Sequence, residues 1–187
     1  KNRTVIEDNV KTVPDRFPTL DRDEHWHLFT RANNHNAVYK KLCIPMTTQN
    51  PQAAVVMQKD AYCDNANMFF VQIPKVTDDK LYSLAAVINS TPFAYFAKSI
   101  ANPQQGEFYK FNKQFLDPVP FPCIEFIEFS EQMQQLAGVA RHIEEANTAI
   151  TTSTSSASRL YPLLNNLWNE VDQLCCELYG LSNSEKG

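Results

Sequence analysis

The sequence predicts an α+β fold, in which a twisted, mainly antiparallel sheet with short helices is followed by a C-terminal helical hairpin. Short apolar runs rich in β-branched and aromatic residues fill residues 40–122. After residue 130, apolar residues recur every three or four positions. The 187 residues are 43% hydrophobic, enough to bury a core. We therefore expect a sheet-based domain over residues 1–122, whose N-terminal segment wraps the core, and a helical hairpin over residues 123–187.

Three apolar runs predict the first strands of the sheet, at residues 41–46, 53–57 and 67–73. Another strand or sheet edge is predicted at residues 108–111, after a turn or exposed loop over residues 102–107. The run 116–122 contains three prolines, which have no N–H to donate to a neighbouring strand. We expect this run to leave the sheet as an extended strap.

Two short helices are predicted at about residues 78–100. Thr77 precedes a stretch whose apolar residues share one helical face, as expected behind a capping residue. Ser90 is the predicted cap of the second helix, because Pro92 follows in what would be its first turn.

Two longer helices are predicted to form the C-terminal hairpin. Apolar positions from Met133 to Ile150 give the first helix, and those from Leu160 to Leu178 give the second, which Gly180 ends. Between them, seven of the eight residues 151–158 are Ser or Thr and break the pattern. The apolar faces of the two helices should meet each other or close on the sheet.

Charge is distributed unevenly along the chain. The formal net charge of −4 argues against a protein that binds nucleic acid by being basic throughout. Residues 1–122 contain 14 Lys and Arg against 12 Asp and Glu, whereas residues 123–187 contain 3 against 9. Any contact with a polyanion therefore belongs to the first part.

Several kinds of catalytic site have no counterpart in the sequence. Neither a glycine-rich nucleotide loop nor a G-x-S-x-G motif is present. His25 and His27 lack companion ligands at the spacing of zinc sites, and the acidic residues 21–24 lack the acidic-x-Lys partner of a metal-dependent nuclease. We predict no catalytic and no metal-binding residue.

The cysteines and the hydropathy pattern bear on the compartment. Five cysteines form no C-x-x-C pair, and an odd, irregularly spaced set is typical of a reduced intracellular chain. No apolar run reaches the roughly 18 to 20 residues that a membrane span needs. We expect a cytoplasmic protein that makes no membrane contact and, since it starts at Lys1 with polar residues, a piece of a longer chain.

Two polar segments, residues 31–41 and 104–114, interleave basic, amide and aromatic residues. Lysine and arginine hold phosphates, and amide and imidazole groups can read base edges. The residues predicted to bind DNA are Arg31, Asn33, Asn34, His35, Lys40, Lys41, Gln105, Lys110 and Lys113.

A set of short motifs occurs in a recognisable order. The strongest are the helix junction Ile88-Asn89-Ser90, the proline-rich strap and the final Leu178-Tyr179-Gly180-Leu181, which an Asp at position 172 precedes. With the Lys-Lys-Leu-Cys-Ile-Pro strand and the Gly-Glu-Phe-Tyr-Lys-Phe segment, this order resembles the TaqI-like C-terminal specificity domain. That domain is the target recognition part of N6-adenine DNA methyltransferases and of fused type II restriction-modification enzymes.

The resemblance implies sequence-specific binding of double-stranded DNA in a prokaryotic cytoplasm, with the N-terminal methyltransferase domain of the parent chain as partner. The family's Asn/Asp-Pro-Pro-Tyr motif is absent here, because Asn50-Pro51 and Asn102-Pro103 are each followed by Gln. No glycine-rich strand end for S-adenosylmethionine is present either. We therefore expect these residues to bind DNA without methylating it, and S-adenosylmethionine to be the cofactor of the parent enzyme.

Two other functions remain open from the residues alone. One is a protein interaction or scaffold module in which the acidic helical hairpin binds a partner. The other is a free-standing hydrolase or nuclease. A salt-dependent interaction with duplex DNA would separate the recognition domain from both.

Overall fold

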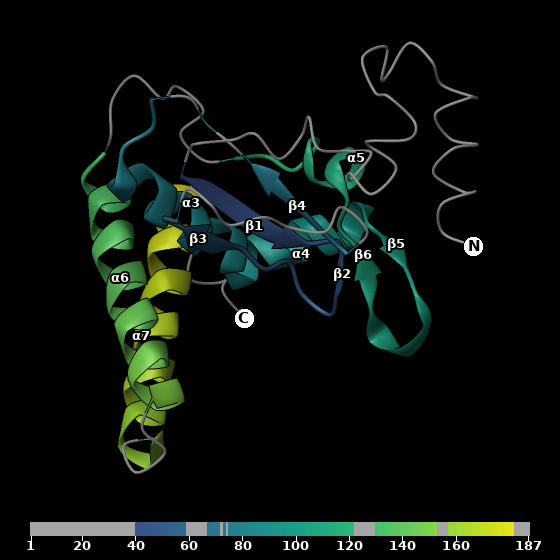
Figure 1. Cartoon of the computed structure of the whole chain (residues 1–187). Helices are drawn as coiled ribbons and strands as arrows, with labels where there is room; N and C mark the ends of the chain where they lie inside the picture. Colours follow the sequence, from purple (N-terminus) through teal and green to yellow (C-terminus); the bar gives the residue numbers. More distant parts are fainter. Residues whose placement is uncertain are drawn as a thin grey trace, which may run out of the picture. The chain divides into compact units, whose positions relative to one another are not determined.

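Figure 1 shows the computed structural model of the chain, which describes residues 40–58, 67–71, 73, 75–121, 130–152 and 157–181. All of these residues belong to one compact unit, Tyr39–Gly187. The unit combines small antiparallel sheets with helices, and its C-terminal part is helical, so the predicted α+β class is confirmed.

The first sheet has the strand order β3-β1-β4, with both pairings antiparallel. Its strands are β1 (Lys41–Pro45), β3 (Ala54–Val56) and β4 (Met68–Val71), which confirms the three strands predicted from apolar runs. Leu42 and Ile44, on one face of β1, are almost fully buried, as the two-residue repeat of a strand requires.

A second sheet has the order β2-β6-β5 and is also antiparallel. It consists of β2 (Thr47–Thr48), β5 (Asn102–Pro103) and β6 (Tyr109–Lys110). The single sheet expected over residues 40–122 is therefore two sheets. The chain changes sheet at Met46, whose N–H donates to the Asn67 carbonyl while its own carbonyl accepts from the Phe111 N–H.

Two consecutive helices follow the first sheet, as predicted. The Thr77 hydroxyl accepts a hydrogen bond from the Lys80 N–H at the start of α3 (Asp78–Asn89). The Ser90 hydroxyl does the same for the Phe93 N–H at the start of α4 (Thr91–Ile100). Every side chain from Leu81 to Ile88 is buried, so α3 is the centre of the core.

The proline-rich strap is only partly extended. A short helix, α5 (Lys113–Leu116), precedes it, and Asp117 continues the helical backbone conformation. The Val119 N–H then donates to the Leu116 carbonyl, which closes a turn. The expectation of an extended segment from residue 116 is thus wrong for its first half, because Pro118 stands in a turn.

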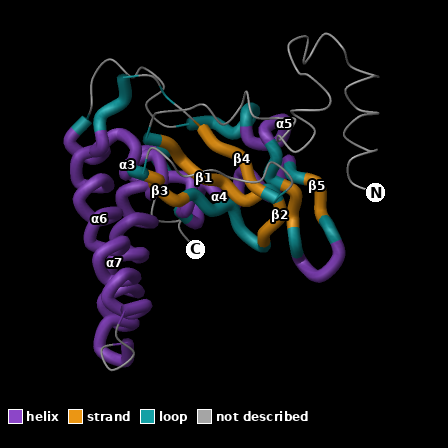
Figure 2. The backbone as a smooth tube through the Cα atoms, in the orientation of Figure 1, coloured by secondary structure: helices purple, strands orange, loops and turns teal. Residues whose placement is uncertain are grey.

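The C-terminal helices α6 (Glu131–Thr152) and α7 (Ala157–Leu178) lie side by side, and α6 also packs along α3 (Figures 1 and 2). α7 ends where Gly180 adopts a φ of 65°. The Leu181 N–H bonds to the Cys176 carbonyl and the Gly180 N–H to the Glu177 carbonyl, the pattern of a glycine helix end. One continuous apolar core joins these helices to α3, α4 and the first sheet.

Candidate nucleic-acid interface

A hairpin at the end of the unit away from α6 and α7 carries two of the predicted DNA-binding residues (Figure 1). Its strands β5 and β6 are joined by a single turn of 3-10 helix, Gln105–Glu107. Gln105 lies in that turn and Lys110 lies in β6, and both side chains are exposed. The structure thus places an amide and a cation on one protruding element.

The tip of the hairpin holds an unusual backbone. Gly106 and Glu107 both have positive φ angles, 76° and 63°, and only glycine adopts that region without cost. The Gln104 N–H donates to the Phe108 carbonyl over 2.7 Å and closes the tip. The strained residue is therefore held by a defined turn.

The two faces of β6 differ. Tyr109 and Phe111 turn inward, with ring centroids 6.0 Å apart, and Phe111 is fully buried. The Lys98 ammonium lies 5.3 Å from the centre of the Tyr109 ring and adds a cation beside the strand. Residues of the opposite face, Phe108 and Lys110, are exposed. Phe108 and Lys98 are not among the residues predicted to bind DNA, because the sequence alone did not show which residues of β6 point outward or that α4 brings Lys98 next to Tyr109.

Lys113 begins α5 and forms an ion pair with Asp117 over 2.5 Å. Both side chains are largely exposed, so water screens this pair and it holds the lysine only weakly. Lys113 therefore stays within the candidate interface.

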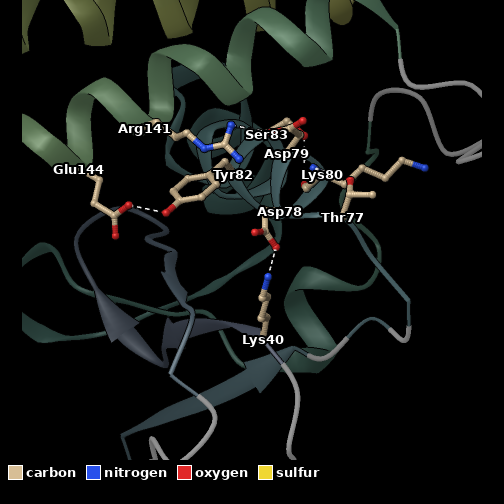
Figure 3. Close-up of polar contacts among 9 residues, drawn as sticks. All are labelled: Lys40, Thr77, Asp78, Asp79, Lys80, Tyr82, Ser83, Arg141 and Glu144. Atoms are coloured by element: carbon tan, nitrogen blue, oxygen red, sulfur yellow. Dashed lines mark hydrogen bonds and ion pairs between the residues drawn. The ribbon is translucent and has the colours of Figure 1, made fainter.

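Lys40 and Lys41 lie in different surroundings, although they are neighbours in sequence. Lys40 pairs with Asp78 at the start of α3 over 2.5 Å (Figure 3). Lys41 is 1% exposed, and its ammonium lies 4.5 Å from the centre of the Phe70 ring. A side chain so enclosed does not reach a DNA backbone from this position. Lys41 is therefore omitted from the interface proposed below.

A second polar cluster joins α3 to α6 (Figure 3). The Tyr82 hydroxyl donates to Glu144 over 2.5 Å, and Arg141 pairs with Asp79 over 2.5 Å while stacking 4.7 Å from the Tyr82 ring centre. Burial, and then the hydrogen bond to Glu144, raise the pKa of Tyr82 to about 12. The hydroxyl therefore stays protonated at physiological pH and acts as a donor.

Tyr82 and Glu144 also line a groove of about 530 Å³ between β3, α3 and α6. Eight of the 17 residues that line it are Ala, Val, Ile or Pro, and Trp168 also lines it. Glu144 is the charged residue among its described walls. The groove is unrelated to the residues predicted to bind DNA.

Three long-range contacts involve the strongest motifs or the residues next to them. The Asn89 side chain accepts from the Ala53 N–H over 3.1 Å and donates to the Ala53 carbonyl over 2.7 Å. Both Asp172 carboxylate oxygens accept from Thr91, one from its N–H over 2.7 Å and the other from its hydroxyl over 2.6 Å.

The third contact comes from Tyr179, whose hydroxyl donates to the carbonyl of Pro120 in the strap over 3.0 Å. Burial raises the pKa of this phenol, which keeps it a donor. The helix junction, the strap and the C-terminal motif are thus linked through α7.

Arg31, Asn33, Asn34 and His35, which are also predicted to bind DNA, lie outside the described residues. Within the described part of the chain, no group of three His, Cys, Asp or Glu residues could hold a metal ion. None of the described helices is both long and apolar enough to cross a membrane. Comparison with protein families gives no matching family, and comparison with curated proteins gives no match.

Proposed function

We propose that the chain is the sequence-specific, DNA-binding target recognition domain of an adenine-specific DNA methyltransferase or of a restriction-modification enzyme. The proposal assigns S-adenosylmethionine binding and methyl transfer to an N-terminal methyltransferase domain of the parent chain. It leaves double-stranded DNA as the ligand of the residues described here and makes the parent a cytoplasmic enzyme of a prokaryote.

The observation that carries the proposal is the convergence of the motifs that resemble such a domain. Asn89 is the last residue of α3, Asp172 lies 83 residues later on α7, and Pro120 belongs to the strap. Hydrogen bonds connect Asn89 to Ala53 next to β3, the start of α4 to Asp172, and the strap to Tyr179. Motifs that describe one scaffold should meet in space, and unrelated coincidences would have no reason to do so.

The distribution of charge also supports the proposal. The described parts of α6 and α7 with their flanks contain six Asp and Glu against two Arg. The segment from α4 to α5 contains Lys98, Lys110 and Lys113 against Glu107 and Asp117. A DNA backbone would be repelled by the helical end and accepted at the hairpin end.

The proposal is tested by selecting duplexes from a randomised DNA library with the 187-residue chain. We expect one sequence pattern to be enriched, and the logarithm of its affinity to fall linearly with the logarithm of salt concentration. Recovery of random sequences with no affinity above that for a scrambled duplex would refute the proposal.

One observation favours the alternative of a protein interaction module. Tyr161 and Leu163 on the first turns of α7 are 55% and 46% exposed. Exposed apolar side chains near the acidic helices would suit a protein partner better than DNA. Both residues can be replaced with Ser and the affinity for duplex DNA measured. Unchanged affinity would show that this surface is independent of DNA binding.

A further inference from the structure

One face of the β5–β6 hairpin carries an aromatic side chain, Phe108, that does not contribute to the core. Phe108 is 41% exposed, whereas Phe111 is buried and its ring packs against that of Tyr109. A Cβ added to Gly106 would lie 3.7 Å from the Phe108 ring, so the ring lies across the tip of the turn. The hairpin therefore presents an aromatic ring at its end.

The polar groups around this ring are mostly amides. Asn102, Gln104 and Gln105 are exposed, and the Gln104 side chain donates to the Pro103 carbonyl over 3.1 Å. Lys110 is the cation of the segment 101–111, which contains no arginine. Arginine is the side chain most often paired with guanine, whereas glutamine pairs with adenine through N6 and N7.

A β-hairpin is an element that one groove of DNA accommodates. The major groove of B-form DNA is about 12 Å wide and admits a two-stranded β-ribbon, whereas the minor groove is about half as wide. In the major groove the thymine methyl group is an apolar feature that a phenylalanine ring can cover. A ring beside an amide is therefore the pair of groups that distinguishes an A·T base pair.

The strained turn supports a binding role for this tip. Glu107 keeps a φ of 63°, which a non-glycine residue adopts only where the surrounding turn imposes it. The Gln104–Phe108 hydrogen bond and the inward rings of Tyr109 and Phe111 impose it here. The hairpin enters a complex with its shape already fixed, so little ordering is needed on binding.

We propose that the β5–β6 hairpin lies in the major groove and reads an A·T base pair, with Phe108 against the thymine methyl group and Gln105 on the adenine. This inference rests on the proposed function and specifies which bases one element of the domain recognises. Lys98, which lies beside the hairpin, and Lys110, which lies in β6, hold the neighbouring phosphates.

The test uses the duplex selected by the 187-residue chain, with each thymine replaced in turn by deoxyuridine, which lacks the methyl group. We expect one replacement to weaken binding about three- to fivefold, the value of one buried methyl group. Phe108→Ala should weaken binding to the unmodified duplex by a similar factor and should show no further loss on that deoxyuridine duplex.

Two further variants make the assignment specific. Gln105→Ala should weaken binding roughly five- to hundredfold on the duplex that contains the A·T pair read by the hairpin. The same substitution should have little effect when that pair is replaced by G·C. Tyr95→Ala removes a ring that is 74% exposed on α4, and this control variant should respond to deoxyuridine as the unchanged protein does. Thermal melting establishes that each variant is folded.

The outcomes separate this inference from the proposed function. If the chain binds no duplex selectively, both are overturned. If it selects a sequence but no deoxyuridine replacement matters, or Phe108→Ala remains as sensitive to the replacement as the unchanged protein, only the reading of an A·T pair by the hairpin is overturned.

Discussion

The helical core and the β5–β6 hairpin use their side chains in opposite ways. In α3, eight consecutive residues from Leu81 to Ile88 are buried between α6 and the first sheet. In the hairpin, every residue from Asn102 to Phe108 is exposed, and the strands are two residues long. Apolar burial stabilises the first region. The conformation of the second region depends instead on the hydrogen bond that closes its turn and on the pairing of β6 with β2.

We expect this contrast to separate stability from DNA binding. Substitutions in the core should alter the free energy of unfolding and should affect the affinity for DNA only through loss of the folded state. Changes on the hairpin should leave that free energy nearly unchanged and alter binding directly. Four substitutions, in order of decreasing expected effect on the free energy of unfolding, examine this division.

The largest effect is expected for Leu136→Ala in α6. Leu136 is fully buried against α3, so the substitution loses apolar contact and leaves a cavity. We expect the free energy of unfolding to fall by about 2 to 5 kcal/mol in a urea titration. Leu163→Ala on the exposed side of α7 is the matched control and should cost less than about 1 kcal/mol. Equal losses for both variants would contradict the core described here.

A smaller effect is expected for Asp172→Asn, which removes one acceptor oxygen from the start of α4. The remaining amide oxygen can serve the Thr91 N–H or its hydroxyl, but not both in the present geometry. We expect a loss of about 1 to 2 kcal/mol, typical of a helix cap bonded to a charged group. Glu170→Gln, an exposed change on the same helix, should stay within about 0.5 kcal/mol.

A double-mutant cycle assigns the loss to this contact. Thr91→Val removes the hydroxyl donor and keeps the N–H. If Asp172 acts through the Thr91 hydroxyl, the double variant should lose clearly less than the sum of the two single losses. Additive losses would mean that Asp172 does not act through this hydroxyl.

The elements of the core were predictable because local rules and tertiary packing agree there. Thr77 and Ser90 cap helices at the positions that their residue types predict, and the spacing from Met133 onward matches the buried face of α6. The division into two sheets was not predictable, since it depends on the bonds of Met46 to residues 21 and 65 positions away. The turn at Pro118 likewise depends on the short helix before it.

The candidate interface was predictable only in outline. Composition identified residues 104–114 as a polar segment with aromatics, and the structure places Gln105 and Lys110 on one hairpin. Composition could not distinguish Lys40 from Lys41, because Lys41 is buried beside the Phe70 ring although it lies on the face of β1 opposite to Leu42 and Ile44. It also could not distinguish the exposed Phe108 from the buried Phe111, because the two residues lie on opposite faces of the strand.

An intermediate effect that depends on pH is expected at Tyr82. Its pKa in the folded protein is about 12, above the ordinary 10 of an unfolded chain, so the protonated hydroxyl stabilises the fold. That contribution is complete below pH 10 and is lost as the pH rises from 10 through 12.

Tyr82→Phe tests this contribution, because Phe lacks both the titration and the hydrogen bond to Glu144. At pH 8 we expect the variant to be less stable by about 0.5 to 1.5 kcal/mol. Unfolding titrations between pH 9 and 12 should show the difference between the two proteins becoming smaller as the pH rises. A difference that stays constant over this range would contradict the role of the hydroxyl.

The smallest effect on stability is expected for Lys110→Ala, and here the comparison between the two regions is sharpest. Lys110 is exposed on β6, and its removal should change the free energy of unfolding by less than about 0.5 kcal/mol. If it contacts a phosphate, affinity should fall about equally for all duplexes, and the slope of log affinity against log salt should decrease in magnitude by roughly one.

Arg159→Ala is the control, because it removes an exposed cation from α7, away from the hairpin. Binding titrations at two salt concentrations, on the selected duplex and on a scrambled one, should therefore distinguish the two variants. An equal change of slope for both would mean that the lysine contributes only to the overall charge. A fall in melting temperature with unchanged affinity would mean instead that its methylene chain covers apolar surface, which would make the hairpin part of the stabilising region.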